Sequence, residues 1–177
     1  MSEAAFVAAT IDLTTAVNEA FNQPKLPAFI LLYSSVDILS SLTRPIGADD
    51  TNGAVFQNWV KKYMLPGASI ACNEKDIWGA RCGLLHTYTV QSRLSRDGKI
   101  REIHYYVGDR GFAQIAQKQI DPTAQDKVVV CIADLLSAFL TAIERFAQDV
   151  QSDSSLRINV FAHASKLIIH ERKKFTD

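Results

Sequence analysis

The residues best suited to chemistry lie in one short stretch, 78–88, which reads WGARCGLLHTY. A helix turns by about 100° per residue, so Arg81 would fall on the same broad side as Ile77, Leu84 and Leu85. A guanidinium keeps its charge when it is buried, and it therefore needs an acidic or anionic partner on such an apolar side. The sequence thus predicts that Arg81 binds a carboxylate or another anion.

Asp37 is a candidate for that partner, because it is the only acid in the apolar segment 27–43. It shares a stripe at helical spacing with Ser34, Ser41 and Arg44, and one interpretation is that this stripe is a solvated face. The other interpretation is that Asp37 pairs with Arg81 inside the protein and orients it. The carboxylate would repel a phosphate bound at Arg81, so the two roles compete.

The opposite side of the same stretch carries Gly79, Gly83 and His86. Two glycines one turn apart cost a helix roughly 1 kcal/mol each relative to alanine. They predict either a close approach by another backbone, such as that of a second subunit, or a weak helix near a bend. His86 lies about 140° from Arg81 on an ideal helix, so the two converge only if both flank a cleft or if a second subunit supplies one of them.

Arg81 and His86 form an R-x(4–6)-H pattern, and Arg157 with His163 forms a second match. The wider block around the first match, GARCGLLHTYTVQSRLSRDGKIREIHYYVG, together with the upstream F-x-x-WV-x-x-Y-x-LP at 56–66, resembles a group of bacterial and plasmid-borne proteins of the HEPN superfamily. The resemblance covers about residues 25–151. It implies an all-α, HEPN-like up-and-down helix bundle.

The resemblance also implies an activity, a metal-independent RNA endonuclease acting as a toxin or in defence. His86 would move a proton to or from the ribose 2′-hydroxyl or the leaving oxygen, and Arg81 would bind the scissile phosphate. Both would act at the interface of a homodimer, without metal or cofactor, and leave a 2′,3′-cyclic phosphate and a 5′-hydroxyl. The alternative is a catalytically inactive HEPN module that binds a nucleotide, RNA or a protein partner. Cys82 favours it, because many active members place Asn, Asp or His after the arginine and a thiol is a poor hydrogen-bond partner.

Tyr88 extends the pattern to R-x-x-x-x-H-x-Y. This resembles HEPN toxins whose motif tyrosine is adenylylated by a nucleotidyltransferase antitoxin. The competing interpretation is a core aromatic, because Tyr88 would share the apolar face with Leu84.

A basic segment follows the motif. It has four cations against one acid, Asp97, and predicts either contact with a phosphate backbone or a merely solvated surface. Its basic residues are Arg93, Arg96, Lys99 and Arg101.

The elements that must position these residues follow from apolar periodicity and from Pro, Gly and turn signals. Asn73 and Asp76 resemble a capping box at the start of the motif helix. We expect a single domain over 1–177, with a small extended or loop insert around 96–124 and an extended run at 100–107. The expected helices are 4–22, 27–43, 53–64, 74–94, 125–151 and 154–166.

Composition limits the classes of protein to which the chain can belong. The chain has 177 residues with 19 Lys+Arg against 19 Asp+Glu, which argues against a general nucleic-acid coat protein. Its three cysteines lie too far apart for a zinc site, and phosphate-loop and metalloprotease signatures are absent. We expect free thiols, no signal peptide, no membrane segment and a cytoplasmic protein.

Overall fold

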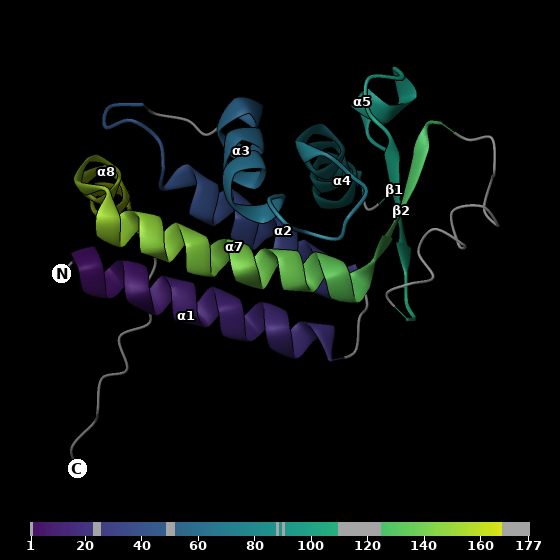
Figure 1. The fold of residues 1–177 in the computed structure, drawn as a ribbon. Helices are drawn as coiled ribbons and strands as arrows, with labels where there is room; N and C mark the ends of the chain where they lie inside the picture. Colours follow the sequence, from purple (N-terminus) through teal and green to yellow (C-terminus); the bar gives the residue numbers. More distant parts are fainter. Residues whose placement is uncertain are drawn as a thin grey trace, which may run out of the picture.

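The computed structural model describes residues 2–22, 26–48, 52–87, 89, 91–109 and 125–167. These residues are mostly helical, as the periodicity predicts, and they include one small two-stranded sheet. In Figure 1, α1 and α7 run side by side, with α2 behind them and α3 and α4 on the far side of α7. The long helices are α1 (Ser2–Phe21), α2 (Leu26–Ser41), α4 (Glu74–Thr87), α7 (Ile132–Ser152) and α8 (Ser154–Ala164).

The core forms where α7 meets the other helices. Phe146 of α7 is fully buried and contacts the ring of Phe6 from α1 and the rings of Trp59 and Tyr63. Burying aromatic rings in such edge-on contacts is among the larger contributions to core stability. None of the helices in the described ranges has the length and apolar content needed to cross a membrane.

The helix predicted over 125–151 is wrong in its first residues. Lys127–Cys131 forms strand β2, and α7 begins only at Ile132. Three consecutive β-branched residues, Val128 to Val130, favour the extended backbone there. The extended run predicted at 100–107 is confirmed as β1 (Glu102–Tyr106), which pairs with β2 in parallel, from Glu102 opposite Lys127 to Tyr106 opposite Cys131. The all-α prediction therefore holds for most of the described residues, but it missed β2 and its pairing with β1.

The motif helix is shorter than the predicted 74–94. It ends at Thr87, and a separate turn, α5 (Arg93–Arg96), follows under a capping box made by Ser92 and Ser95. The amide of Thr89 donates to the carbonyl of Gly83 at 3.3 Å, so the chain folds back over the end of the helix. A Cβ atom at Gly83 would lie 2.8 Å from the Thr89 carbonyl oxygen, and glycine is what allows this approach.

The helix predicted over 53–64 consists of an α-helical part followed by a π-helical part. Asn52 caps α3 (Gly53–Trp59), and a π-helical turn, η1 (Val60–Met64), continues it. The π turn inserts one extra residue per turn and carries Tyr63 and Met64 onto the buried side, against α7.

Candidate functional site

Asp37 of α2 and Arg81 of α4 form an ion pair. Oδ2 of Asp37 lies 2.7 Å from Nε and 2.6 Å from Nη2 of Arg81. The two side chains keep only about a fifth of their surface exposed, 21% and 19%. Of the two interpretations of Asp37, the structure shows the one in which it satisfies the cation on the apolar side of α4.

Arg81 also reaches His86. Nη1 of Arg81 lies 3.1 Å from Nε2 of His86, although the two residues start about 140° apart on the helix. Both side chains therefore lie toward one edge of α4, at its exposed C-terminal end. A guanidinium only donates hydrogen bonds, so Nε2 of His86 is the acceptor in this contact.

Trp78, about one turn before Arg81 on α4, supports the guanidinium from a third direction. The guanidinium carbon lies 5.1 Å from the centre of the indole ring, which itself packs on Phe56 of α3. A cation over an indole face is attracted to it, and the ring restricts the rotation of the guanidinium. The sequence interpretation missed Trp78, although its i, i+3 spacing to Arg81 was a usable signal.

The electrostatics of the pair show two opposing influences. Burial raises the pKa of Asp37 above its ordinary value, and the hydrogen bonds and charge of Arg81 only partly offset this rise. The carboxylate is therefore costly to keep charged, and its charge depends on Arg81. Burial also raises the pKa of Cys82, so this cysteine is a neutral thiol near pH 7 and not a nucleophilic thiolate.

The four basic residues after the motif fall into two groups. Arg101 donates from Nε and Nη2 to Oδ2 of Asp76, and the Asp76 side chain is only 2% exposed. Arg93, Arg96 and Lys99 are exposed, and Asp97 lies 4.0 Å from Arg93 and 3.4 Å from Lys99. Arg101 is thus held in a structural ion pair, and its contact with phosphate stays a prediction.

The structure also explains the two glycines. A Cβ atom at Gly79 would collide with the side chain of Ile100, and one at Gly83 would collide with the backbone of Thr89 and Gln91. The close approach that the glycines predicted is made by the same chain, which folds over α4. A second subunit is not needed to account for them.

The remaining candidates are the second R-x(4–6)-H match, Tyr88 and a metal site. In the second R-x(4–6)-H match, Arg157 donates to the Gln151 carbonyl and the buried His163 contacts the Arg44 carbonyl, so this pair does not meet. Tyr88 lies outside the described residues. Within the part of the chain that the structure describes, His, Cys, Asp and Glu side chains form no group that could hold a metal ion.

Asp76 is the residue whose role the sequence interpretation understated. Its capping function is confirmed, since Oδ2 accepts the amide of Asn73 at 3.0 Å. It additionally accepts the backbone amide and the guanidinium of Arg101. No local pattern indicates that long-range pair.

Comparisons of the chain with protein-family models, with curated protein sequences and with solved structures gave no match.

Proposed function

We propose that this chain is a HEPN-type, metal-independent RNA endonuclease that acts as a homodimer. The observation that carries the proposal is the 3.1 Å contact between Arg81 and His86 at the exposed end of α4. A phosphate-binding cation and a proton-transferring group must lie within reach of the same phosphodiester, and this pair meets that requirement.

The chemistry assigned to the pair is a transesterification. When RNA binds, Nη1 of Arg81 turns from Nε2 of His86 to the phosphate, and Nε2 then accepts the proton of the ribose 2′-hydroxyl while that oxygen attacks the adjacent phosphorus. Arg81 binds a non-bridging oxygen and stabilises the charge that develops on it. The bond from phosphorus to the 5′ oxygen breaks as that oxygen takes a proton from solvent water, and the imidazolium of His86 returns its proton to the solvent. The products are a 2′,3′-cyclic phosphate and a 5′-hydroxyl.

RNA is proposed to reach the pair along the exposed cations of α5 and the turn after it. Arg93, Arg96 and Lys99 are more than one-third exposed and follow α4 directly in the chain. Neutralising phosphates releases condensed counterions, so replacing these three by glutamine should weaken RNA binding and flatten its salt dependence. Lys61→Gln, an exposed lysine on η1, is the matched control.

A catalytically inactive HEPN module is the second candidate, and the Asp37 contact favours it. Asp37 occupies two donors of Arg81 at 2.7 and 2.6 Å and adds a negative charge where a phosphate would bind. In this alternative, Arg81 serves the structure and the surface of α4 binds a nucleotide, RNA or a protein partner.

RNA digestion in the presence of EDTA separates the two. We expect cleavage by the wild type and a loss of about 100-fold or more in His86→Ala, the usual size of a general acid–base contribution. Arg81→Lys should reduce cleavage by a similar factor, because a lysine cannot bind the phosphate in a bidentate way. Arg157→Ala, from the second motif match, should retain full activity.

The same digestion experiment can also refute the nuclease proposal. Equal inactivity of the wild type and His86→Ala on varied RNAs, with the fold intact, would support the inactive module. Sedimentation equilibrium tests the homodimer separately, and a monomer at micromolar concentration would refute that part.

A further inference from the structure

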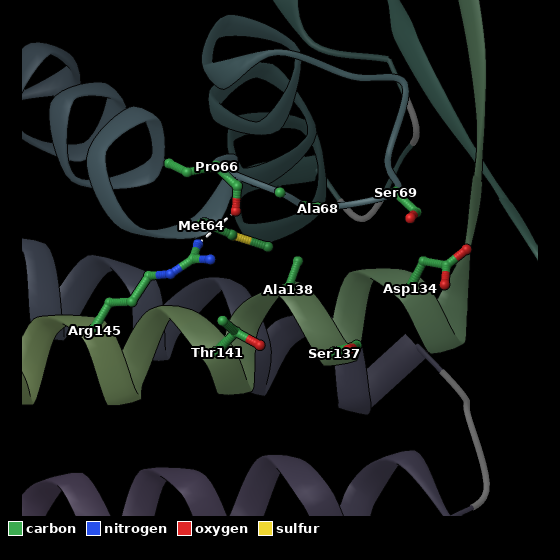
Figure 2. A pocket seen from close by; sticks show the side chains of 10 residues that line it. Met64, Pro66, Ala68, Ser69, Asp134, Ser137, Ala138, Thr141 and Arg145 are labelled. Carbon is green, nitrogen blue, oxygen red and sulfur yellow. Dashed lines mark hydrogen bonds between the residues drawn. The ribbon is translucent and has the colours of Figure 1, made fainter.

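A polar cavity of about 240 Å³ lies between α7 and the loop that follows η1 (Figure 2). Asp37, Arg81 and His86 do not line it, so the cavity is separate from the candidate active site. The share of one water molecule in the liquid is about 30 Å³, so the cavity has the volume of about eight waters. It suits a small organic ion and is too small to enclose a nucleotide.

Arg145 presents its guanidinium to this cavity in a fixed orientation. Its Nη1 donates to the carbonyl of Tyr63 at 3.1 Å and to the carbonyl of Pro66 at 2.5 Å, which uses both Nη1 protons. Figure 2 shows the head group reaching from α7 to Pro66 across the cavity. Because the two carbonyls already hold the guanidinium, a ligand that binds its other donors immobilises little more of the side chain.

The Nε and Nη2 donors form the unused edge of this guanidinium. No hydrogen bond or ion pair joins them to any residue in the described ranges, and Asp149, one turn further along α7, pairs with Lys62 instead. A Cβ atom placed at Gly67 would lie 3.7 Å from Nη2, so the space beside this donor is open. An edge with Nε and Nη2 side by side binds a carboxylate through two parallel hydrogen bonds.

The hydroxyl groups of Ser137 and Thr141 are a second, independent observation. Thr10 and Thr14 donate to the carbonyl four residues earlier, as helical hydroxyl groups often do. Ser137 and Thr141 line the cavity and make no such bond within the part of the chain that the structure describes. Thr141 is four positions before Arg145, which places the Cβ atoms of the two residues about 5–6 Å apart. Its hydroxyl group is therefore within reach of a polar group that adjoins a carboxylate on Arg145.

Asp134 lines the far end of the cavity and has no role in the inference. It already has an interaction within the protein. It is eleven positions before Arg145 on α7, which separates the two Cα atoms by roughly 16 Å along the axis. Coulomb energy falls with distance, so this carboxylate does not outweigh a guanidinium in direct contact with an anion.

We propose that this cavity binds a short 2-hydroxycarboxylate, with its carboxylate on Nε and Nη2 of Arg145 and its hydroxyl group on the side chain of Thr141. The carboxylate supplies two acceptors for the unused edge, and a hydroxyl group can both donate to threonine and accept from it. The inference does not depend on the proposed nuclease activity, because it uses no residue of that site.

Lactate, propionate and lactamide are the probes that separate the two contacts. Propionate is lactate without its hydroxyl group, and lactamide keeps the hydroxyl group but carries no charge. In NMR titrations of the full chain we expect a Kd of about 1 mM for lactate, because so small a ligand makes few contacts. Propionate should bind about fivefold more weakly and lactamide at least about tenfold more weakly, since a charged hydrogen bond contributes more than a neutral one.

The amides that shift should belong to residues 65–69 and 137–145, which surround the cavity. Equal affinities of lactate and lactamide would overturn the proposal, and so would the absence of any shift at about 10 mM lactate, well above the expected Kd.

Thr141→Val tests the hydroxyl contact with a side chain of nearly the same shape. It should weaken lactate about fivefold, to the level of propionate, and leave propionate unchanged. Thr15→Val, at an exposed position of α1, is the matched control and should alter neither affinity.

Arg145→Lys tests the carboxylate contact, because it keeps the charge but cannot bind a carboxylate in a bidentate way. It should weaken lactate and propionate by the same factor, about tenfold. Undiminished lactate binding in Thr141→Val or in a folded Arg145→Lys would place the ligand elsewhere and refute the assignment.

Discussion

One oxygen of Asp37 accepts a hydrogen bond from Nε of Arg81 and lies 2.6 Å from its Nη2, and this ion pair joins α2 to the helix that carries the motif. The pair is mostly buried, so the Asp37 carboxylate depends on Arg81 to remain charged, and the guanidinium needs the carboxylate to offset its own charge. Removing one partner leaves an uncompensated charge, which costs more than removing both.

We therefore expect strong non-additivity between Asp37→Asn and Arg81→Gln. Each single variant should lower the free energy of unfolding, and the double variant should lose less than their sum by about 1–3 kcal/mol. Urea denaturation of the four proteins measures this coupling. Losses that add to within about 0.3 kcal/mol would mean that the pair contributes no specific interaction.

The contrast between Arg101 and Arg93 gives a second prediction. Arg101→Ala leaves the Asp76 carboxylate, only 2% exposed, without its cation and should cost about 3 kcal/mol or more. The Arg93 side chain is 88% exposed, and Arg93→Ala should change stability by less than about 0.5 kcal/mol. Thermal unfolding of both variants checks this difference, and similar transition temperatures would contradict the structural role of Arg101.

Gly79→Ala and Gly83→Ala should lower the stability of the protein by different amounts. A methyl group at Gly79 meets the end of the flexible Ile100 side chain, which can rotate away, whereas one at Gly83 meets the backbone of Thr89 and Gln91. Gly83→Ala should therefore destabilise the protein by about 1–3 kcal/mol, and more than Gly79→Ala does. The opposite order in denaturant titrations would mean that the chain over the end of α4 moves easily.

Alkaline pH should weaken the fold. Burial raises the pKa of the Cys72 thiol from 9.0 to about 12, and it also raises the pKa values of Tyr33 and Tyr105. The unfolded chain releases these protons at ordinary pKa values, so the folded state binds more protons above about pH 9. The free energy of unfolding should then fall as pH rises toward 12, by up to about 1.4 kcal/mol per pH unit for each such group.

Urea titrations at about pH 8 and about pH 10.5 measure this loss. Cys72→Ala removes one of the three groups and should reduce the difference between the two pH values. Val130→Ala, at another buried position, lowers stability without removing a titrating group and should leave the difference unchanged. Equal stability of the wild type at both pH values would contradict the prediction.

Local patterns were sufficient to predict the helices, because apolar spacing and capping residues act within a few positions. Asn52 and Asp153 cap α3 and α8 through their side chains, and the periodic face of α7 is the face that is buried. The valine run before α7 was the exception. Its strand form depends on pairing with β1, more than twenty residues away, and local periodicity carries no information on that partner.

The candidate site was predictable in part for the same reason. The rule that a buried guanidinium needs an acid pointed to Asp37, the only acid in its apolar segment. The positions of Arg81 and His86 around the helix did not predict their contact. The contact forms because the long Arg81 side chain extends toward the exposed end of α4. The ion pair of Arg101 was not predicted, because its partner, Asp76, is 25 positions away.

The Asp76–Arg101 contact closes the chain from the start of α4 to the start of β1 into a ring that is fastened at both ends. Arg93 and Arg96 lie within this closed segment, which is anchored at both ends. A force on either arginine is therefore carried to α4 through the chain at its C-terminal end and through Asp76 near its N-terminal end.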